Sequence, residues 1–198
     1  MLSLFDNKKL VCGVDEAGRG SLAGPVTAAA VILPKNYKNS LIKDSKKLNQ
    51  DQRARLYNEI KKDCISYSIM NIDSKKIDKI NILNSTYLAM NFAIENLDIK
   101  PHKIIIDGNR FKTNKKINFE CIVGGDDKYL SIAAASILAK VKRDEIMYEL
   151  HTLFPIYDWK NNKGYGTMIH REMISKHGLC RFHRKTFKIK NKLLKLTI

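Results

Sequence analysis

The sequence predicts an α/β or mixed architecture around one sheet. Three observations support this: short apolar runs typical of buried strands, longer stretches with the 3.6-residue periodicity of helices, and an order in which two strands come first and strands then alternate with helices. The chain has 198 residues, no internal repeat and no Pro/Gly/Ser-rich linker, which suits one domain. We expect that domain to span residues 1–187, with a basic tail over residues 188–198.

The first two predicted elements are strands that form a hairpin. Residues 10–16 are an apolar run that ends at Ala17-Gly18-Arg19-Gly20, where two glycines interrupt the pattern. Residues 25–33 form a second run, rich in Ala and β-branched residues, which Pro34 closes. Because the two runs lie so close in sequence, we expect them to pair through an unusually elaborate, glycine-rich connection.

The rest of the chain alternates between strands and helices. Residues 49–64 show helical spacing, and Asn49 is a candidate N-cap. The further predicted strands cover residues 64–72, 103–107 and 119–123, and the further predicted helices cover residues 81–97, 128–150 and 167–177. Since the first half of the 128–150 helix is apolar nearly all round, we expect it to be buried.

The composition is strongly basic. The chain carries 36 Lys and Arg residues against 20 Asp and Glu residues, a formal net charge of +16. A balance of this kind is typical of proteins that bind polyanions, and nucleic acid is the commonest of these. A compositional bias of the genome toward Lys, Asn and Ile is the alternative explanation of the charge.

Several classes of protein are disfavoured. The longest uncharged apolar run, residues 28–33, is far shorter than the ~20 residues of a membrane span, and the first residues do not resemble a secretory leader. The four cysteines are widely spaced, which argues against a zinc site or a disulfide framework. We therefore expect a cytoplasmic protein with buried, reduced thiols and no membrane partner.

Acidic residues stand at the ends of three predicted strands, where a basic chain has little structural need for them. Asp15 and Glu16 end the first strand, Asp107 ends the 103–107 strand, and Asp126 follows the 119–123 strand behind two glycines. Ligand sites in α/β sheets lie at the carboxyl ends of strands, and clustered carboxylates repel unless a cation joins them. The oxygen ligands favour Mg²⁺ or Mn²⁺ over zinc. A turn-capping role is the alternative for each acid taken alone.

The first strand end poses a geometric question. Neighbours on a regular strand point to opposite faces, so Asp15 and Glu16 serve one site only if the strand is twisted or bulged there, or if one of them supplies its backbone carbonyl. The following glycine loop has the spacing G-x-G-x-x-x-G and leads into a strand, which excludes a dinucleotide fingerprint. Its glycines allow close approach to a ligand, and Arg19 between them is suited to phosphate or sugar.

Seven motifs, in order over about residues 10–187, closely resemble those of type 2 ribonucleases H, the ribonuclease HII family. The motifs are Gly13-Val14-Asp15-Glu16-Ala17-Gly18-Arg19-Gly20 with Leu22-Ala23-Gly24-Pro25-Val26, then Asp44-Ser45-Lys46-Lys47-Leu48, Asp107-Gly108-Asn109, Gly125-Asp126, Ser131 to Lys140 with Val141 and Arg143-Asp144, Lys163-Gly164-Tyr165-Gly166-Thr167 with His170, and His183-Arg184 with Phe187.

The resemblance implies a ribonuclease H-like fold, with a mixed five-stranded sheet flanked by helices and a helical C-terminal portion. It implies an endonuclease that hydrolyses the RNA strand of RNA–DNA hybrids, cuts at ribonucleotides embedded in duplex DNA, and leaves 3′-hydroxyl and 5′-phosphate ends by two-metal-ion catalysis with Mn²⁺ or Mg²⁺. We expect a monomer. The ribonuclease HIII type carries an extra N-terminal domain, for which the ten or so residues before the first motif leave no room.

The resemblance also assigns roles to individual residues. The metal-binding, catalytic carboxylates implied by it are Asp15, Glu16, Asp107 and Asp126. Gly18, Arg19 and Gly20 are implied to read the 2′-hydroxyl group, and Tyr165 to pack on the sugar at the RNA–DNA junction. Residues expected to bind the substrate near its phosphates are Ser45, Lys46, Thr167, His170 and Arg184, together with Asp44.

Some positions depart from the family pattern or stay ambiguous. Ser21 stands where Pro is common, and Gly166 where Ala is common. Asp127 beside Asp126 leaves the fourth ligand open to a shift by one, although the preceding glycine favours Asp126. Asp144 fits a family motif, but a charge partner such as Lys140, four residues earlier on the same helix, accounts for it structurally.

Tyr165 has a structural interpretation as well as a functional one, since an aromatic ring here suits packing over the helical end of the domain. We expect the flanking glycines to be mobile and to give a substrate-facing ring room to settle. Two other classes of function stay open. One is a different ribonuclease H-like nuclease such as a junction resolvase, which would not require the Gly-Arg-Gly loop. The other is a non-enzymatic basic protein that binds nucleic acid, which would not require acids at three strand ends.

Overall fold

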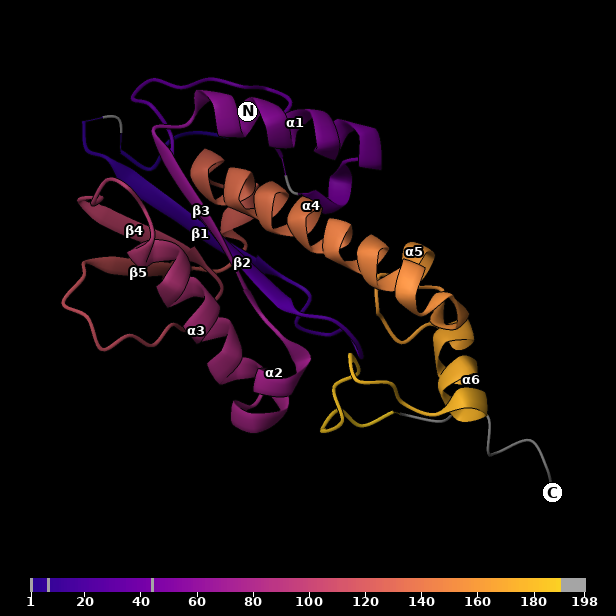
Figure 1. The fold of residues 1–198 in the computed structure, drawn as a ribbon. Helices are drawn as coiled ribbons and strands as arrows, with labels where there is room; N and C mark the ends of the chain where they lie inside the picture. The colour runs from indigo at the N-terminus through magenta and orange to yellow at the C-terminus, as the bar shows by residue number, and fades with distance from the viewer. Residues whose placement is uncertain (1, 7, 44, 190–198) are drawn as a thin grey trace.

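The strands of the protein form one mixed sheet (Figure 1). The structure is a computed structural model and describes residues 2–6, 8–43 and 45–189. The strand order is β3-β2-β1-β4-β5, and the bounds are β1 Val11–Ala17, β2 Val26–Ile32, β3 Ser66–Ile72, β4 Lys103–Asp107 and β5 Phe119–Ile122. β1, β2 and β3 pair in antiparallel fashion, whereas β4 runs parallel to β1 and β5 parallel to β4. The carboxyl ends of β1, β4 and β5 therefore meet at one edge of the sheet.

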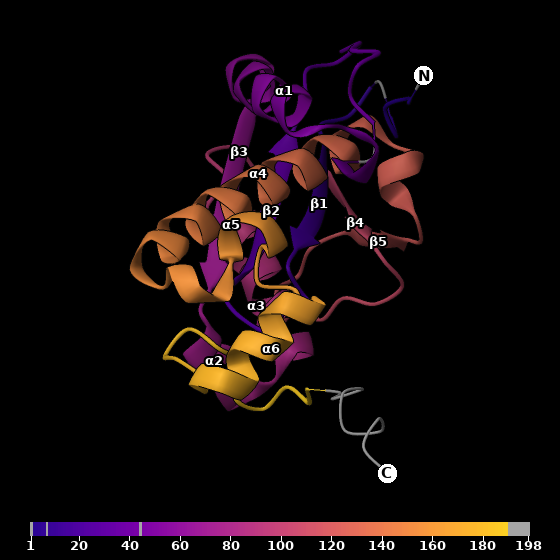
Figure 2. The ribbon, with the colours of Figure 1, turned by 90° about the vertical axis from the view of Figure 1, so that its right-hand side faces the viewer.

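Helices cover both faces of the sheet. α4 (Leu130–Leu153) lies against β1 and β2 on one face, with α1 (Gln50–Asp63) beside it, while α2 (Ser74–Ile80) and α3 (Ile82–Glu95) cover the other face (Figure 1). The short helix α5 (Trp159–Asn162) and α6 (Met168–His177) follow α4, and Figure 2 shows α6 at the end of the molecule opposite α1. Three short 3₁₀ turns, Ser45–Lys47, Gly125–Asp127 and Pro155–Tyr157, complete the described elements.

α4 packs on β1 without intervening side chains. A Cβ atom built on Gly13 of β1 lies only 2.2 Å from the carbonyl carbon of Ser131, so no side chain fits between the strand and the helix. The following turns of α4 are rich in alanine and fully buried. This confirms the prediction that the first half of the helix is buried, and it lets the helix backbone run close to the carboxyl end of β1.

Most predicted elements are confirmed, with small differences at their ends. The hairpin of β1 and β2 forms as expected, and Asn49 caps α1 in a capping box in which its side chain accepts from the Gln52 backbone and the Gln52 side chain accepts from the Asn49 backbone. The helices α2 and α5 were not predicted. Asn81, with φ of 65°, separates α2 from α3 and caps α3, close to the predicted start of that helix at residue 81.

The expectation of buried, reduced thiols is borne out in part. All four cysteines are free thiols, but only Cys12 is buried, and the others are half-buried. No helix in the described part of the chain has the length and apolar character to span a membrane. Most of the basic tail predicted over residues 188–198 lies outside the described residues.

The contact between α4 and β1 can be tested by adding one methyl group. We expect Gly13→Ala to lower the free energy of unfolding by about 3 kcal/mol, because its Cβ atom overlaps the α4 backbone, which cannot rotate away. Gly20→Ala is the matched control, since a Cβ atom there meets only the Tyr165 ring at 3.9 Å. Denaturant unfolding measures both, and equal stabilities for the two variants would contradict this packing.

Candidate active site

Carboxylates from two parallel strands meet at the sheet edge. β1 and β4 pair up to Val14 and Ile106, so the acids that follow, Asp15 and Asp107, end neighbouring strands. Asp15 is only 5% exposed. Its burial raises the pKa of its carboxyl well above the ordinary value, and the negative charges of Glu16 and Asp107 raise this pKa further.

Asp15 and Glu16 approach the edge from opposite faces of the sheet. The pairing of β1 with β2 stays regular through Ala17, so the bulge that sequence analysis considered is absent. Asp15 lies on the α4 face, where a hydrogen bond with Ser136 lowers its pKa in opposition to the burial. Glu16 lies on the α3 face, where it lines a cavity with Thr86 and other α3 residues. A single site that includes both carboxylates therefore takes one from each face of the sheet.

The turn after β5 is tied to the end of β4. The backbone N–H of Gly125 donates to Oδ1 of Asp107 at 2.7 Å, which brings the 3₁₀ turn with Asp126 to the carboxylate edge. Asp126 is 6% exposed, whereas the side chain of Asp127 is 52% exposed and pairs with Lys47 at 2.5 Å. The buried acid of the two is thus the one that sequence analysis favours as a ligand.

The acids fit a hard divalent cation by their chemistry. They offer only oxygen donors, and the mutual repulsion that raises the pKa of Asp15 is what a bound cation removes. Among the described residues, no three His, Cys, Asp or Glu side chains already converge as a metal site. Glu16 pairs with Arg19 at 3.3 Å, and Asp107 accepts from the backbone N–H of Gly125.

A cavity of about 380 Å³ brings many of the predicted site residues together. Its lining comprises Asp15, Glu16, Ala17, Gly18, Arg19, Gly20, Ser45, Asp107, Ser136, Lys140 and Tyr165. A second cavity of about 230 Å³, on the α3 side, shares Glu16, Arg19 and Asp107 with the first. The two cavities therefore lie on either side of the same three residues, and Tyr165 lines only the larger one.

The loop after β1, residues 18–25 (the glycine-rich loop), packs tightly against residues 163–167 (the tyrosine segment). The backbone N–H groups of Leu22 and Ala23 donate to the carbonyl of Gly164 at 2.7 and 3.3 Å. A Cβ atom on Gly164 would lie 2.5 Å from the carbonyl oxygen of Ala23, and one on Gly166 would lie 2.9 Å from Leu22. The prediction that these glycines provide mobility is therefore wrong, because they permit close packing.

Tyr165 is held firmly by its backbone while its ring stays accessible. Its carbonyl accepts from the backbone N–H of Thr167 at 2.8 Å and from Nδ1 of His170 at 2.9 Å. Its side chain is 39% exposed and lies 5.4 Å from the Arg143 guanidinium. The ring thus projects from a rigid segment at the side of the cavity.

Two residues expected at the substrate phosphates are buried instead. His170 is fully buried and accepts from Nε1 of Trp159 at 3.0 Å through its Nε2, and burial lowers its pKa. Arg184 is 2% exposed, and its guanidinium donates to backbone carbonyls of the glycine-rich loop. Both residues therefore lie in the interior and hydrogen-bond to segments that line the cavity: His170 to the carbonyl of Tyr165, and Arg184 to the glycine-rich loop.

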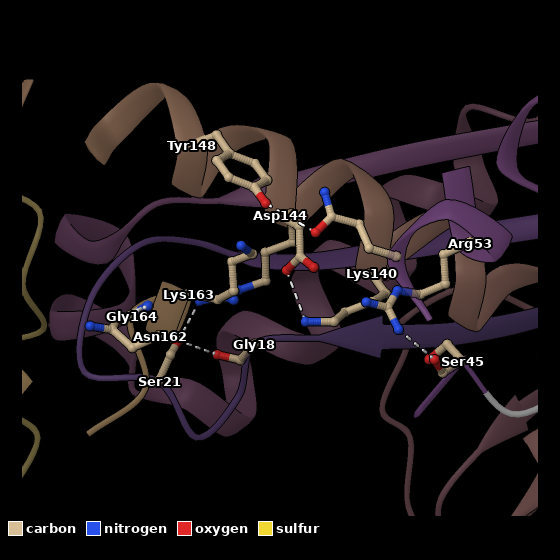
Figure 3. A network of polar contacts seen from close by, with 12 residues as sticks. Gly18, Ser21, Ser45, Arg53, Lys140, Asp144, Tyr148, Asn162, Lys163 and Gly164 are labelled. Carbon is tan, nitrogen blue, oxygen red and sulfur yellow. Dashed lines mark hydrogen bonds and ion pairs between the residues drawn. The ribbon is translucent and has the colours of Figure 1, made fainter. Parts of the chain in front are cut away.

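Of the remaining predicted residues, Ser45 lines the cavity, whereas Asp44 lies outside the described residues. Ser45 hydrogen-bonds to Ser136 (3.0 Å), and Arg53 donates to the Ser45 carbonyl (Figure 3). Thr167 is exposed and caps α6, and the side chain of Lys46 lies outside the described residues. The structural interpretation of Asp144 is confirmed by its ion pair with Lys140 at 2.8 Å.

Three cavity or loop contacts were missed from the sequence, and all three come from α4. Ser136, Lys140 and Arg143 are spaced by four and three residues, so they follow one face of the helix toward the glycine-rich loop. Arg143 is the residue from which such a contact could have been predicted, because it is a cation in a helix whose neighbouring turns are buried. A buried cation needs several acceptors, which indicates a contact with exposed backbone carbonyls.

The chain matches the family model described as ribonuclease HII over residues 12–190. It belongs to the ribonuclease HII family. It is 53% identical to the ribonuclease HII of Christiangramia forsetii over 196 residues, which cover 99% of each chain. As a member of this family it is a metal-dependent endoribonuclease that acts on RNA–DNA hybrids.

Solved structures agree with the family and confirm the predicted fold. Ribonuclease H2 from Pyrococcus horikoshii superimposes with a TM-score of 0.75 at 26% identity, covering 90% of this chain and 94% of that one. The ribonuclease HII of Archaeoglobus fulgidus, solved in a complex with PCNA, gives a TM-score of 0.73 at 25% identity, covering 93% and 98%. The five-stranded mixed sheet with flanking helices is thus the ribonuclease H-like fold that the motifs implied.

The repulsion at Asp15 predicts an unusual pH dependence for the metal-free protein. A carboxyl whose pKa is raised on folding binds its proton more tightly in the folded state, so its charge destabilises the fold above the raised pKa. This penalty disappears as the pH falls toward the ordinary value of 3.8. We expect Asp15→Asn to melt at a higher temperature than wild type near neutral pH, with a difference that shrinks on acidification.

Thermal melts in the presence of a chelator measure this difference. The matched control is Asp127→Asn, which removes an exposed acid from the same edge of the sheet and should give no stabilisation. An Asp15→Asn variant that melts at or below the wild-type temperature near neutral pH would contradict the assigned repulsion.

Proposed function

We propose that the chain cuts the RNA strand of hybrids, and also single ribonucleotides embedded in duplex DNA, by a two-metal-ion mechanism that leaves 3′-hydroxyl and 5′-phosphate ends. One observation carries the proposal: Asp15, Glu16 and Asp107 share a cavity with the Gly-Arg-Gly sequence and Tyr165. Carboxylates that hold metal thus stand beside groups suited to reading sugars. A junction resolvase or a simple basic binding protein requires no such combination.

The four acids would act together as the ligands of two metal ions. Asp15 and Asp107, at the ends of neighbouring strands, serve as the central ligands, while Glu16 on the α3 face and Asp126 behind Gly125 complete the two positions. When bound, Mn²⁺ or Mg²⁺ activates the attacking water and neutralises the charge that develops on the phosphate. Because Asp15 and Glu16 are neighbours on a regular strand, their carboxylates would approach the metal ions from opposite faces of the sheet.

The glycine-rich loop reads the 2′-hydroxyl group through its backbone. The carbonyls of Gly18 and Arg19 accept from the buried Arg184. In a trans peptide the N–H group points away from the carbonyl, so the N–H groups of Arg19 and Gly20 face the opposite side, toward the cavity. Gly20 carries no side chain to obstruct a ribose there, and the 2′-hydroxyl is the group that separates RNA from DNA.

Other residues bind the backbone of the duplex. Ser45, Lys46 and Thr167 are assigned to phosphates near the cavity, and the excess of 16 positive charges favours the rest of the duplex without sequence preference. The exposed Tyr165 ring packs on the deoxyribose that follows a ribonucleotide. We propose that the protein acts as a monomer in the cytoplasm.

The metal ligands are tested by Asp107→Asn. The amide keeps the size of the side chain but removes a charge that holds the cation, so hybrid cleavage should fall by about a thousandfold or more, corresponding to several kcal/mol of lost stabilisation. Turnover of a labelled RNA–DNA hybrid with Mg²⁺ and with Mn²⁺ measures the loss. Asp127→Asn is the control and should cleave at the wild-type rate, whereas full activity in Asp107→Asn would exclude Asp107 from the site.

The role of Tyr165 is tested by comparing two substrates. A ring that packs on the deoxyribose after a ribonucleotide contributes to cutting at a single embedded ribonucleotide and has no such contact inside continuous RNA. We expect Tyr165→Ala to lower turnover of the single-ribonucleotide duplex about tenfold more than turnover of the hybrid, as loss of one stacked contact implies. If both rates fall together, or neither falls, Tyr165 does not read the junction.

A further inference from the structure

Two buried arginines lie beneath the glycine-rich loop. Arg143, on α4, is fully buried, and Arg184, after α6, is 2% exposed. Both guanidinium groups donate to backbone carbonyls between Gly18 and Pro25, more than 100 residues away in sequence. Burying two cations is costly. Arg184 offsets the cost through four backbone carbonyls, whereas Arg143 donates from Nε and Nη2 to Pro25, Ser21 and Ala23 and its buried Nη1 has no hydrogen-bond partner among the described residues.

Arg184 fixes the direction of the loop peptides. It donates to the carbonyls of Gly18 at 2.7 Å and Arg19 at 2.8 Å, and to those of Gly24 at 3.1 Å and Pro25 at 3.0 Å. It thereby joins the two ends of the loop. Because these carbonyls turn inward, the N–H groups of Arg19 and Gly20 turn outward toward the cavity.

Arg143 joins the loop to the tyrosine segment. It donates to Oγ of Ser21 at 2.7 Å and to the carbonyl of Pro25 at 3.0 Å. Ser21 in turn donates to the carbonyl of Gly18 at 2.9 Å, a bond that Figure 3 shows. Its guanidinium also lies 5.4 Å from the Tyr165 ring, within the range of a cation–π contact. One side chain therefore contacts both elements that are proposed to read sugars.

Arg143 also leaves no room for a side chain at Gly18. A Cβ atom on Gly18 would lie 1.9 Å from Nε of Arg143, so the loop backbone lies directly on the arginine side chain. The guanidinium that contacts this backbone also faces the Tyr165 ring, so its position affects the spacing between loop and ring, together with the direct approach of Gly20, whose Cβ atom would lie 3.9 Å from the ring. The guanidinium of Arg184 lies over a different ring, that of Phe187, at 5.0 Å.

We propose that Arg143 and Arg184 are positioning residues with separable roles: Arg184 aims the loop N–H groups at the ribose, and Arg143 sets the spacing between the loop and Tyr165 that recognition of a ribonucleotide–deoxyribonucleotide junction requires. The inference rests on the proposed function. Both substrates present a 2′-hydroxyl to the loop, whereas only the single-ribonucleotide duplex places a deoxyribose under Tyr165. The two arginines should therefore affect the two substrates differently.

The test uses conservative variants of the full chain, Arg143→Lys and Arg184→Lys, which keep the charge and lose the forked donor geometry. The kcat and KM values are measured on a continuous RNA–DNA hybrid and on a duplex with one embedded ribonucleotide. Arg184→Lys should lower kcat on both substrates by a similar factor of about ten or more. Arg143→Lys should lower the ratio of single-ribonucleotide to hybrid turnover by about tenfold.

A double variant isolates the link to Tyr165. If Arg143 acts through the ring, Arg143→Lys should change the ratio in the wild-type background and leave it unchanged in the Tyr165→Ala background. Ile60→Ala, a buried change in α1 far from the loop, is the stability control. It should lower the melting temperature and keep the wild-type ratio.

The possible outcomes separate the role of Arg143, the role of Arg184 and junction reading by Tyr165. A Tyr165→Ala variant that shifts the ratio, together with an Arg143→Lys variant that does not, would overturn the inference and leave the proposed function intact. An unchanged ratio in Tyr165→Ala would instead refute junction reading by Tyr165 and, with it, the role of Arg143. If Arg143→Lys fails to fold, Arg184→Lys still tests whether Arg184 positions the loop. A wild-type kcat of Arg184→Lys on both substrates would overturn that role.

Discussion

The repulsion among carboxylates at the ends of two parallel strands is the constraint on which the site depends. Asp15 and Asp107 end neighbouring strands, and Asp15 is buried beside a further charge on Glu16, which raises its pKa. A fold maintains such an arrangement at a cost, because each charge disfavours the others. The surrounding structure supplies the compensation through the close contact of α4 with β1 and the N–H group that Gly125 gives to Asp107.

A second constraint governs the side of the cavity that faces the sugar. The glycine-rich loop and the tyrosine segment are far apart in the chain but are joined by backbone hydrogen bonds, by glycines that permit close approach, and by two buried guanidinium groups. The recognition surface is consequently made of backbone N–H groups and one exposed ring on a rigid support. Such a surface suits a substrate that is read by its sugar and independently of its base sequence.

The sequence alone predicted the features that depend on local pattern. Strand periodicity, the cap at Asn49 and the acids at strand ends are all visible within a few residues, and the family motifs are contiguous. The helix α2 was missed because its seven residues are too few to show a helical period. The burial of His170 and Arg184, and the packing role of Gly164, were missed because their partners lie in distant segments. The assignment of the four metal ligands remains a prediction.

The most direct measurement is the melting temperature of wild type and Asp107→Asn with and without Mn²⁺. If the carboxylates at the sheet edge hold the cation, Mn²⁺ should raise the melting temperature of wild type, because a ligand that binds only the folded state stabilises it, and should raise that of Asp107→Asn far less. Without metal, the variant should melt at the higher temperature, since one repelling charge is gone. An equal response of both proteins to Mn²⁺, or no response in wild type, would contradict the account.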